Sequence, residues 1–322
     1  MPEQRVHRVA PVTGDAPRPF WSVMIPTHEP SVAQLEEAIR SVLAAPVDDA
    51  QIELVDDGST HFDPESFVAN VGDDRVRASR HENRGIGASW NRCIERARGA
   101  WVHLLHQDDV VRPAFYAELR AAIERHPGAR AAVGQAEFLD SKGRPRSRSF
   151  PPGVSPGILD DWIEHVFVDL KIQCASIVVR RDVYEELGGF DESLRYVLDW
   201  DLWKRIASRH ALVYAPRAVA GYRVHAASAT SRLAATGRDM AEILASIERD
   251  AHLLPPDLAG GVRRRARENY ARFAIDNAGK ILRRSGDVAA VLRQLRGARE
   301  FTSWGSVMRY AGARLIGRGR RR

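Results

Sequence analysis

Carboxylates follow short apolar stretches at separate points of the chain. Asp56 and Asp57 end one such stretch, Asp108 and Asp109 follow another, and Asp199 lies in an acidic segment much further on. If these stretches are parallel strands, their carboxyl ends meet at one edge of a sheet, where open α/β sheets bind nucleotides. Carboxylate oxygens suit hard divalent cations, which bridge to phosphate oxygens. The pattern predicts a nucleotide-dependent enzyme.

The elements expected around these acids alternate between strand and helix. Strands are expected at 22–26, 52–55 and 101–105, and helices at 31–43, 84–98 and 113–125. Such alternation predicts a mostly parallel sheet with helices on both faces. Residues 141–157 interrupt it with four prolines and three glycines, and are expected to form a loop or flap near the site. Beyond Thr230 the pattern is helical only.

The composition is that of a globular chain with a sizeable core. Of the 322 residues, 44% are apolar and 28% are charged, which excludes the disordered and fibrous classes. There is no run of about 18 apolar residues, and the N-terminus lacks the apolar segment of a signal peptide, so a cytoplasmic location is predicted. Cys93 and Cys174 are the only cysteines, too few for a disulfide framework or a zinc site.

Five segments, in their order along the chain, are similar to motifs of the family 2 glycosyltransferases. They are SVMIPTHEP (22–30), IELVDDGST (52–60), ENRGIGASWNRCIERARGAWVHLLHQDD (82–109), GGFDESLRYVLDWDLWKRIA (188–207) and YRVHAASAT (222–230). This resemblance implies a GT-A fold, a Rossmann-like sheet, and transfer of a sugar from a nucleotide-sugar donor to an acceptor hydroxyl. The expected organisation is a flexible N-terminal arm (1–19), a GT-A domain (20–230) and a basic helical extension (231–322).

The resemblance also assigns residues to the donor, expected to be a UDP- or dTDP-sugar. A carboxylate can accept the imino N–H of uracil or thymine, and Asp57 matches the family's base-contacting acid. Arg84 is placed to meet the diphosphate, and Asp108 to face the ribose or the sugar. The full expected donor set is Pro26, Thr27, Glu29, Asp57, Arg84, Asn91 and Asp108.

A divalent ion, Mg²⁺ or Mn²⁺, is expected to neutralise the leaving diphosphate. Asp109 is the expected ligand, and His225 matches a position from which related enzymes reach the metal or diphosphate. A neutral imidazole can bind Mn²⁺. The family often has an acid where this chain has His106, so a set of three acidic ligands is not expected. His106 is expected to pack or hydrogen-bond at a strand end.

The acceptor hydroxyl needs a base, and Asp199 occupies the place of the family's catalytic carboxylate. The acid that often precedes it is Leu198 here. Asp201 is a rival two residues on, where it would serve capping in a first helical turn. With Asp199 as base the expected reaction is an inverting single displacement. It would add one sugar per encounter to a saccharide or lipid-linked acceptor of the cell envelope or an extracellular polysaccharide.

The C-terminal part differs from the rest in charge. Residues 231–322 carry 20 basic against 9 acidic side chains, whereas residues 1–230 carry 28 against 33. Apolar side chains share a helical face at 288–295, and aromatic residues lie among the arginines after 300. Such a tail is expected either to contact an anionic membrane surface or to be a solvated or subunit-packing helix. Nothing in it resembles a base-reading module, so no nucleic acid is expected.

Two other functions remain open at this point. A sugar nucleotidyltransferase would also use an α/β sheet and a divalent ion, but would show a Gly-rich phosphate loop after the first strand. That position reads Pro26-Thr27-His28-Glu29-Pro30 here. A non-catalytic nucleotide-sugar-binding or scaffold protein of the same fold is the second alternative. Retention of Asp57, Asp109 and Asp199 argues against it.

Overall fold

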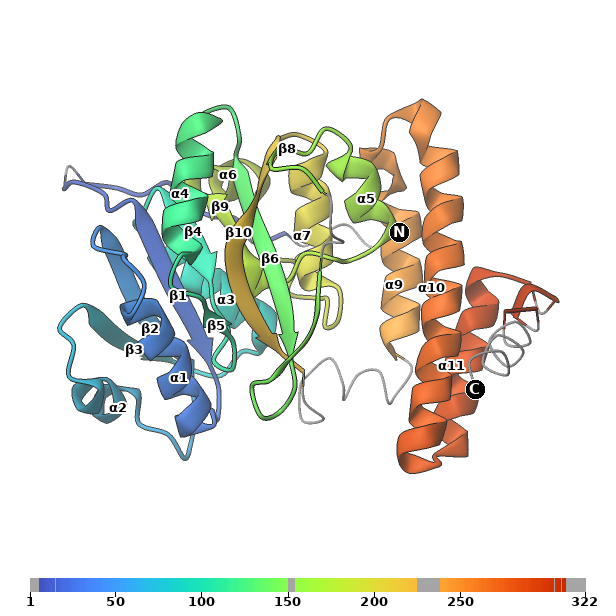
Figure 1. The fold of residues 1–322 in the computed structure, drawn as a ribbon, viewed down its shortest axis with the longest axis horizontal. Coiled ribbons are helices and arrows are strands. Elements are labelled where there is room, and N and C mark those ends of the chain that lie inside the picture. The colour runs from blue at the N-terminus through green and yellow to red at the C-terminus, as the bar shows by residue number, and fades with distance from the viewer. Residues whose placement is uncertain are drawn as a thin grey trace. The chain divides into compact units, whose positions relative to one another are not determined.

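The computed structural model describes residues 6–14, 16–149, 154–224, 238–303, 305–307 and 309–310 (Figure 1). The chain divides into two compact units. The first comprises Met1–Trp162 and Lys171–Val224, and the second comprises Ile163–Leu170 and His225–Arg322. All the acidic motifs therefore belong to the first unit, and the basic extension belongs to the second.

The first unit is built on one sheet with the strand order β3-β2-β1-β4-β9-β6-β10-β5. Strands β3, β2, β1 and β4 run parallel, β9 is antiparallel to both its neighbours, and β6 and β10 are parallel to each other. The expected mostly parallel α/β sheet is confirmed. The strands are β1 (Trp21–Thr27), β2 (Ala50–Asp57), β3 (Val76–His81), β4 (Trp101–Leu104), β5 (Val110–Val111), β6 (Ala131–Leu139), β7 (Pro145–Arg148), β8 (Gly157–Ile158), β9 (Ile177–Arg180) and β10 (Leu212–Arg223).

Helices cover both faces of this sheet. Alternate side chains of β1, from Trp21 to Ile25, pack into one apolar cluster with α1 and α4. The opposite face carries Ser22, whose hydroxyl accepts the Gly99 N–H at 2.8 Å just beyond α3. The helices are α1 (Val32–Leu43), α2 (Pro64–Val71), α3 (Ile86–Arg96), α4 (Phe115–Arg125), α5 (Trp162–Val168), α6 (Arg181–Leu187) and α7 (Leu198–Ala207), with a short 3-10 turn η1 (Cys174–Ser176).

The stretch 141–157, which was expected to be a loop, contains strand β7 and the first residue of strand β8. Strand β7 pairs antiparallel with the end of β6, and β8 pairs with β10. Proline begins β7, which is consistent with an edge strand, where a missing N–H costs no ladder hydrogen bond. The expectation missed these strands because their side chains lack the apolar alternation that marks a half-buried strand.

The described part of the segment 1–19, expected to be a flexible arm, lies against the first unit. Val6 forms a bridge with Asp191, and the Gly189 N–H donates to the His7 carbonyl at 2.8 Å. Arg18 donates to the carbonyls of Arg98 and Gly99. Most of these bonds use backbone groups, which carry no signature in the pattern of side chains.

The second unit is helical in its described part, as expected. Besides α5, which belongs to this unit from Ile163 on, its elements are α9 (Arg238–Asp250), a 3-10 turn η2 (Ala251–Leu253), α10 (Pro256–Ser285) and α11 (Val288–Phe301). None of the helices in the described residues combines the length and apolar character needed to span a bilayer. The prediction of a membrane-contacting tail depends on residues 300–322, and most of these lie outside the described residues.

Candidate active site

The acidic motifs meet at the carboxyl edge of the parallel strands. At the end of β1, the His28 N–H donates to the Gln107 side-chain oxygen at 2.8 Å, which ties the first motif to the segment containing Asp108. The His28 ring lies 3.1 Å from the Asp57 carbonyl oxygen at the end of β2. Strands β1, β2 and β4 thus end in one hydrogen-bonded region, as their parallel alignment requires.

Asp57 is buried, and its carboxylate is hydrogen-bonded to the segment that leads into α3. Its carboxylate accepts the backbone N–H groups of Arg84 at 2.9 Å and Gly85 at 3.2 Å. Gly58 has a φ of 64°, and a Cβ there would lie 2.6 Å from the Asn83 backbone nitrogen. Only glycine therefore fits where the loop after β2 comes close to the segment before α3. The Arg84 side chain is exposed. The expected base-contacting acid is therefore held in place by the segment that carries Arg84.

Asp56 differs from its neighbour in burial and partners. It is fully buried, and its carboxylate accepts the Ser59 N–H at 3.0 Å and pairs with Arg80 at 2.8 Å. Glu29, with a φ of 40°, accepts the Thr60 N–H at 2.6 Å. These hydrogen bonds lower the pKa of the Glu29 carboxyl. Both acids hold the loop after β2.

Pro26 and Thr27 lie in the buried end of β1. The Thr27 hydroxyl donates to the Ile25 carbonyl at 3.2 Å. This bond leaves the lone pairs of the Thr27 hydroxyl oxygen as an acceptor site.

Asn91, expected on the donor side, makes its contacts with the loop before α7. Its amide nitrogen donates to the Phe190 carbonyl at 3.0 Å and to Glu192 at 2.9 Å, and its amide oxygen accepts the Phe190 N–H at 2.7 Å. A Cβ on Gly189 would lie 2.2 Å from this amide oxygen, so the loop can approach only because residue 189 is glycine. The structure thus joins α3 to the segment that leads to Asp199.

Replacing Asn91 by alanine is expected to destabilise the protein by about 1–3 kcal/mol. The substitution leaves the buried N–H and carbonyl of Phe190 without partners. Urea denaturation followed by circular dichroism measures the loss. Asn83→Ala, at an exposed position, is the control and should change stability little. Equal stability of the two variants would contradict this account of Asn91.

Asp109 carries a buried oxygen that has no hydrogen-bond partner in the described part of the chain. The side chain is 1% exposed; Oδ1 accepts the Arg223 N–H at 2.9 Å, whereas Oδ2 lies 3.7 Å from His106 Nδ1 and accepts no hydrogen bond. Burial, and then the negative charge of Asp108, raise the pKa of the Asp109 carboxyl well above its usual range. An orphaned carboxylate oxygen beside the half-buried Asp108 fits a divalent cation.

Any further ligands of a metal ion would have to come from groups other than Asp108 and Asp109. Among the described residues, no group of three or more His, Cys, Asp and Glu side chains is arranged to hold an ion. His225 lies outside the described residues. His106 stacks on Trp90 with ring centroids 4.8 Å apart, which agrees with the packing role expected of it.

Arg223 supports the turn that carries both aspartates. Its Nε donates to the Asp108 carbonyl at 2.9 Å, and its guanidinium pairs with Glu37 at 2.7 Å. Its charge is therefore used within the fold.

Asp199 and Asp201 are distinguished by their surroundings. Asp201 is fully buried, and its Oδ2 pairs with Arg205 at 2.9 Å. Arg205 in turn donates to the Gly189 carbonyl at 2.7 Å, so this pair holds the loop before α7. Asp199 is half-buried and accepts the Trp200 N–H at 2.8 Å. Burial raises the pKa of the Asp199 carboxyl to about 7. Its surroundings are those of a proton acceptor near neutral pH.

Two of the predicted site carboxylates affect the pKa of the Cys174 thiol. The thiol is buried at the start of η1, and burial followed by the charges of Asp199 and Asp109 raises its pKa well above the usual value. No pattern in the sequence singles out Cys174 in this place.

The pKa of Asp199 predicts the pH dependence of the reaction. As a general base it must be ionised, so kcat/KM is expected to rise about tenfold per pH unit below pH 7 and to level off above it. The sign follows from the raised pKa, because the protonated form dominates below it. A pH profile from 5 to 9 measures this. A rate that is flat or that falls between pH 5 and 7 would contradict it.

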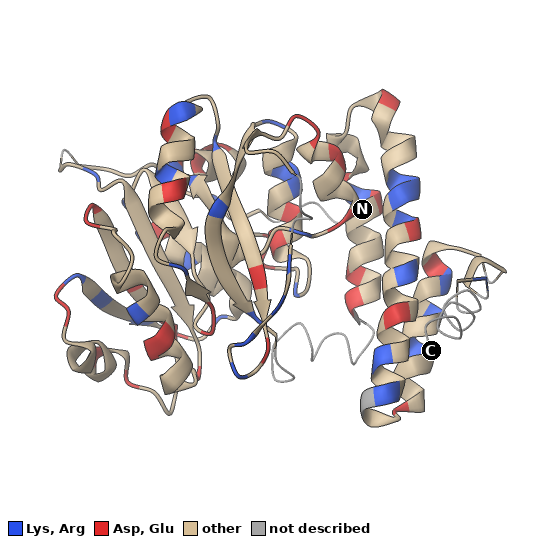
Figure 2. Ribbon diagram, viewed as in Figure 1, with Lys and Arg blue, Asp and Glu red and all other residues tan. Residues whose placement is uncertain are grey.

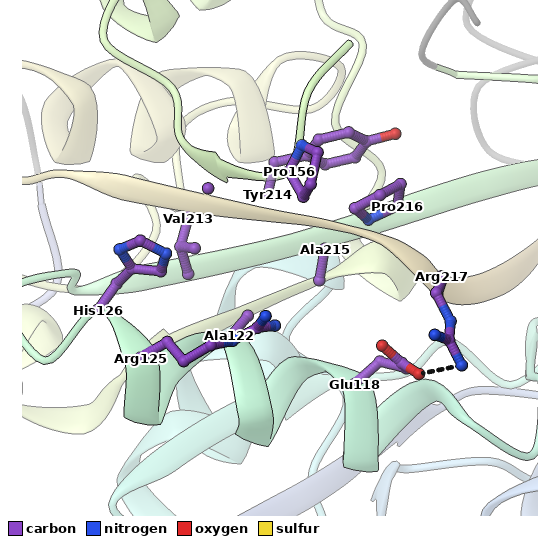
Figure 3. A pocket seen from close by; sticks show the side chains of 11 residues that line it. Glu118, Ala122, Arg125, His126, Pro156, Val213, Tyr214, Ala215, Pro216 and Arg217 are labelled. Carbon is purple, nitrogen blue, oxygen red and sulfur yellow. Dashed lines mark ion pairs between the residues drawn. The ribbon is translucent and has the colours of Figure 1, made fainter. Parts of the chain in front are cut away.

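A separate pocket lies away from these residues. It has a volume of about 230 Å³ and is lined by parts of α4, β8 and β10, including His126, Tyr214 and the ion pair of Glu118 with Arg217 (Figure 3). It contains none of the residues predicted for the donor, the metal or the base. The candidate site is therefore the acidic edge of the sheet.

A GT-A-type sheet with convergent carboxylates at its edge defines a nucleotide-binding α/β enzyme class. The family model described as Glycosyl transferase family 2 matches residues 22–188, which is slightly more than half of the chain. The chain belongs to this family.

Similar proteins include two that are named for polysaccharide biosynthesis. An uncharacterized protein of Mycobacterium tuberculosis is 27% identical over 69% of this chain and 73% of its own length. The succinoglycan biosynthesis protein ExoO of Rhizobium meliloti is 33% identical over 53% of this chain and 51% of its own. The O-antigen biosynthesis protein RfbC of Myxococcus xanthus is 28% identical over 59% of this chain. The chain spans only 14% of RfbC, so similarity to it concerns one part of a longer protein.

Two solved structures show the same fold at low sequence identity. S. aureus TarS 1–349 in complex with UDP-GlcNAc has a TM-score of 0.58 and 13% identity, covering 92% of each chain. The mannosyltransferase PcManGT of Pyrobaculum calidifontis, in complex with GDP-Man and Mn²⁺, has a TM-score of 0.59 and 16% identity, covering 93% of this chain and 86% of its own. They support the GT-A fold.

Proposed function

We propose that this protein is a metal-dependent glycosyltransferase that moves one sugar from a nucleotide-diphosphate sugar to an acceptor hydroxyl by inverting single displacement. The observation that supports the proposal is the contrast between two carboxylates, Asp109 and Asp199, in a family 2 fold. One carboxylate has an unused buried oxygen for a cation, and the other has a pKa of about 7 suited to a base.

Each residue then has a defined task. Asp109 Oδ2 and Asp108 would hold Mg²⁺ or Mn²⁺, which supplies positive charge at the leaving diphosphate. Asp199 accepts the proton of the acceptor hydroxyl as the glycosidic bond forms. Asp57 and Thr27 present acceptor groups to the nucleotide base, and the exposed guanidinium of Arg84 reaches the diphosphate.

Two members of the predicted donor set act through other groups. Glu29 positions the loop after β2 through Thr60, and Asn91 positions the loop before α7 through Phe190. Both therefore shape the donor site without needing to contact the donor. His225 remains a predicted ligand of the metal or diphosphate.

The donor and acceptor classes are part of this proposal, and the UDP-GlcNAc complex of TarS supports a UDP-sugar as one of the donors to be tested. A UDP- or dTDP-sugar carrying a hexosyl or deoxyhexosyl group is the proposed donor, and a saccharide or lipid-linked acceptor is its partner. The names of ExoO and RfbC support a role in envelope or extracellular polysaccharide assembly. We place the reaction in the cytoplasm, at the inner face of the membrane if the acceptor is lipid-linked.

A panel of nucleotide sugars tests the proposal. The purified protein is incubated with each donor and Mg²⁺ or Mn²⁺, and released nucleoside diphosphate is measured with and without EDTA. Metal-dependent release from a UDP- or dTDP-sugar is expected. Pyrophosphate formed from a nucleoside triphosphate and a sugar phosphate would instead identify a nucleotidyltransferase.

A further inference from the structure

Helix α11 has two exposed apolar side chains that do not pack against the rest of the second unit. Val288 and Leu292 are one helical turn apart and are 60% and 49% exposed. They lie on the side opposite the residues that α11 buries, which are Ala290, Gln294, Ala298 and Phe301. Within the amphipathic pattern at 288–295, Val291 and Leu295 are half-buried, whereas Val288 and Leu292 are exposed.

The end of α10 carries a further exposed apolar side chain. Gly286, with a φ of 67°, ends α10, and Asp287 caps α11, so the two helices form a hairpin. Leu282, in the last turn of α10, is 53% exposed. We call Leu282, Val288 and Leu292 the hairpin patch. Three exposed large apolar side chains within eleven residues mark an interaction surface rather than scattered exposure.

The charge around the hairpin patch is predominantly positive. Between residues 280 and 299 there are six basic side chains and one acidic side chain. In the described part of the chain, Lys280, Arg283, Arg296 and Arg299 form no ion pair with an acidic side chain. Their charges are available to a partner.

Near the other end of α10, by contrast, three arginines are paired with acidic side chains. Arg263 and Arg267 pair with Glu248, and Arg265 pairs with Glu164 of α5, all within the second unit. Basic side chains occur along α10 from Arg263 onward (Figure 2), and those compensated in this way lie in its N-terminal half. Four basic side chains without an acidic partner among the described residues, Lys280, Arg283, Arg296 and Arg299, are thus in the same stretch of the chain as the exposed apolar side chains.

We propose that the α10–α11 hairpin docks on an anionic lipid surface. The hairpin patch enters the boundary between head groups and acyl chains, and the surrounding basic side chains pair with lipid phosphates. A second copy of the chain fits less well, because a symmetric contact would bring two surfaces of the same strong positive charge together. This inference is independent of the proposed transferase activity, since lipid binding requires neither donor nor metal.

Co-sedimentation of the full chain with vesicles tests the proposal. We expect binding to vesicles of equal parts phosphatidylglycerol and phosphatidylcholine at low salt, and little to pure phosphatidylcholine. The double substitution Val288→Ser with Leu292→Ser should weaken binding by about tenfold or more, because it removes most of the inserted apolar surface. Val32→Ser is the matched control, since Val32 is 54% exposed on α1 and lies in the first unit.

Substitution of basic side chains measures the electrostatic contribution to vesicle binding. Lys280→Gln, Arg296→Gln and Arg299→Gln together should weaken binding by roughly fivefold per residue at low salt. The same change at the exposed Arg77 and Arg92 is the control and should have little effect. Circular dichroism of each variant establishes that it is folded, which is expected because the substituted side chains are exposed.

Several outcomes would overturn the proposal. One is a wild-type chain that stays in the supernatant with anionic vesicles at low salt. Another is unchanged binding of the Val288 and Leu292 variant when removal of residues 311–322 abolishes binding, which would assign the contact to the tail. A third is a concentration-dependent dimer in sedimentation velocity that the double substitution dissociates, which would assign the patch to a second copy.

Discussion

Asp199→Asn should reduce sugar transfer by about 10²–10⁴-fold while leaving donor affinity within a few-fold. The amide keeps the size of the side chain and can still accept the Trp200 N–H, but it cannot take a proton at neutral pH. The loss should therefore lie in kcat. Initial rates with the best donor of the panel, and calorimetric titration with the same donor, measure the two quantities separately.

Asp201→Asn is the comparison at the rival position. It breaks the charge balance of a buried pair with Arg205, which is expected to cost on the order of 3 kcal/mol of folding free energy. The folded fraction of this variant should retain most of the turnover per molecule. If Asp201→Asn removes turnover while Asp199→Asn retains it, the two roles are assigned the wrong way round.

Asp109→Asn should abolish most metal-dependent turnover. Removing the charge on the unpaired Oδ2 weakens the expected cation site, and a cation supplies several kcal/mol of charge stabilisation. The rate should fall by roughly a hundredfold or more. The paramagnetic resonance of free Mn²⁺, titrated with protein, measures binding of the ion without relying on activity. Asp108→Asn should also weaken binding of the ion.

A buried carboxylate outside the site provides the control for this experiment. Asp239 is fully buried in the second unit, where the Gln294 amide donates to it. Asp239→Asn should leave both Mn²⁺ binding and turnover unchanged. Tight Mn²⁺ binding by the Asp109→Asn variant would contradict the assignment of Asp109 as a ligand.

The strands and the order of the acidic motifs could be predicted because their signals are local. Val23 to Ile25 is a short apolar run that ends in a polar turn, and the expected strand differs from β1 by only one residue at each end. Helix α1 begins one residue after Ser31, as expected from its apolar spacing, although the Ser31 side chain makes no capping hydrogen bond. Such elements follow from neighbours along the chain.

The supporting contacts of the site could not be predicted in the same way. Asn91 bonds to Phe190, 99 residues away, and Arg223 bonds to Asp109 across 114 residues. Neither pair leaves a periodic signal, because each depends on how distant loops meet. The amphipathic pattern at 288–295 showed which residues share a face of α11. Periodicity alone does not say whether that face is packed against the chain or exposed.

The central claim is a single displacement at the anomeric carbon of a nucleotide sugar, and NMR of one reaction mixture tests it most directly. The best UDP- or dTDP-sugar of the panel is incubated with the full chain and its metal. The account predicts ³¹P signals of the nucleoside diphosphate, and ¹H signals of a product sugar whose anomeric configuration is inverted relative to the donor. A product that keeps the donor's configuration, or phosphorus signals of pyrophosphate, would contradict it.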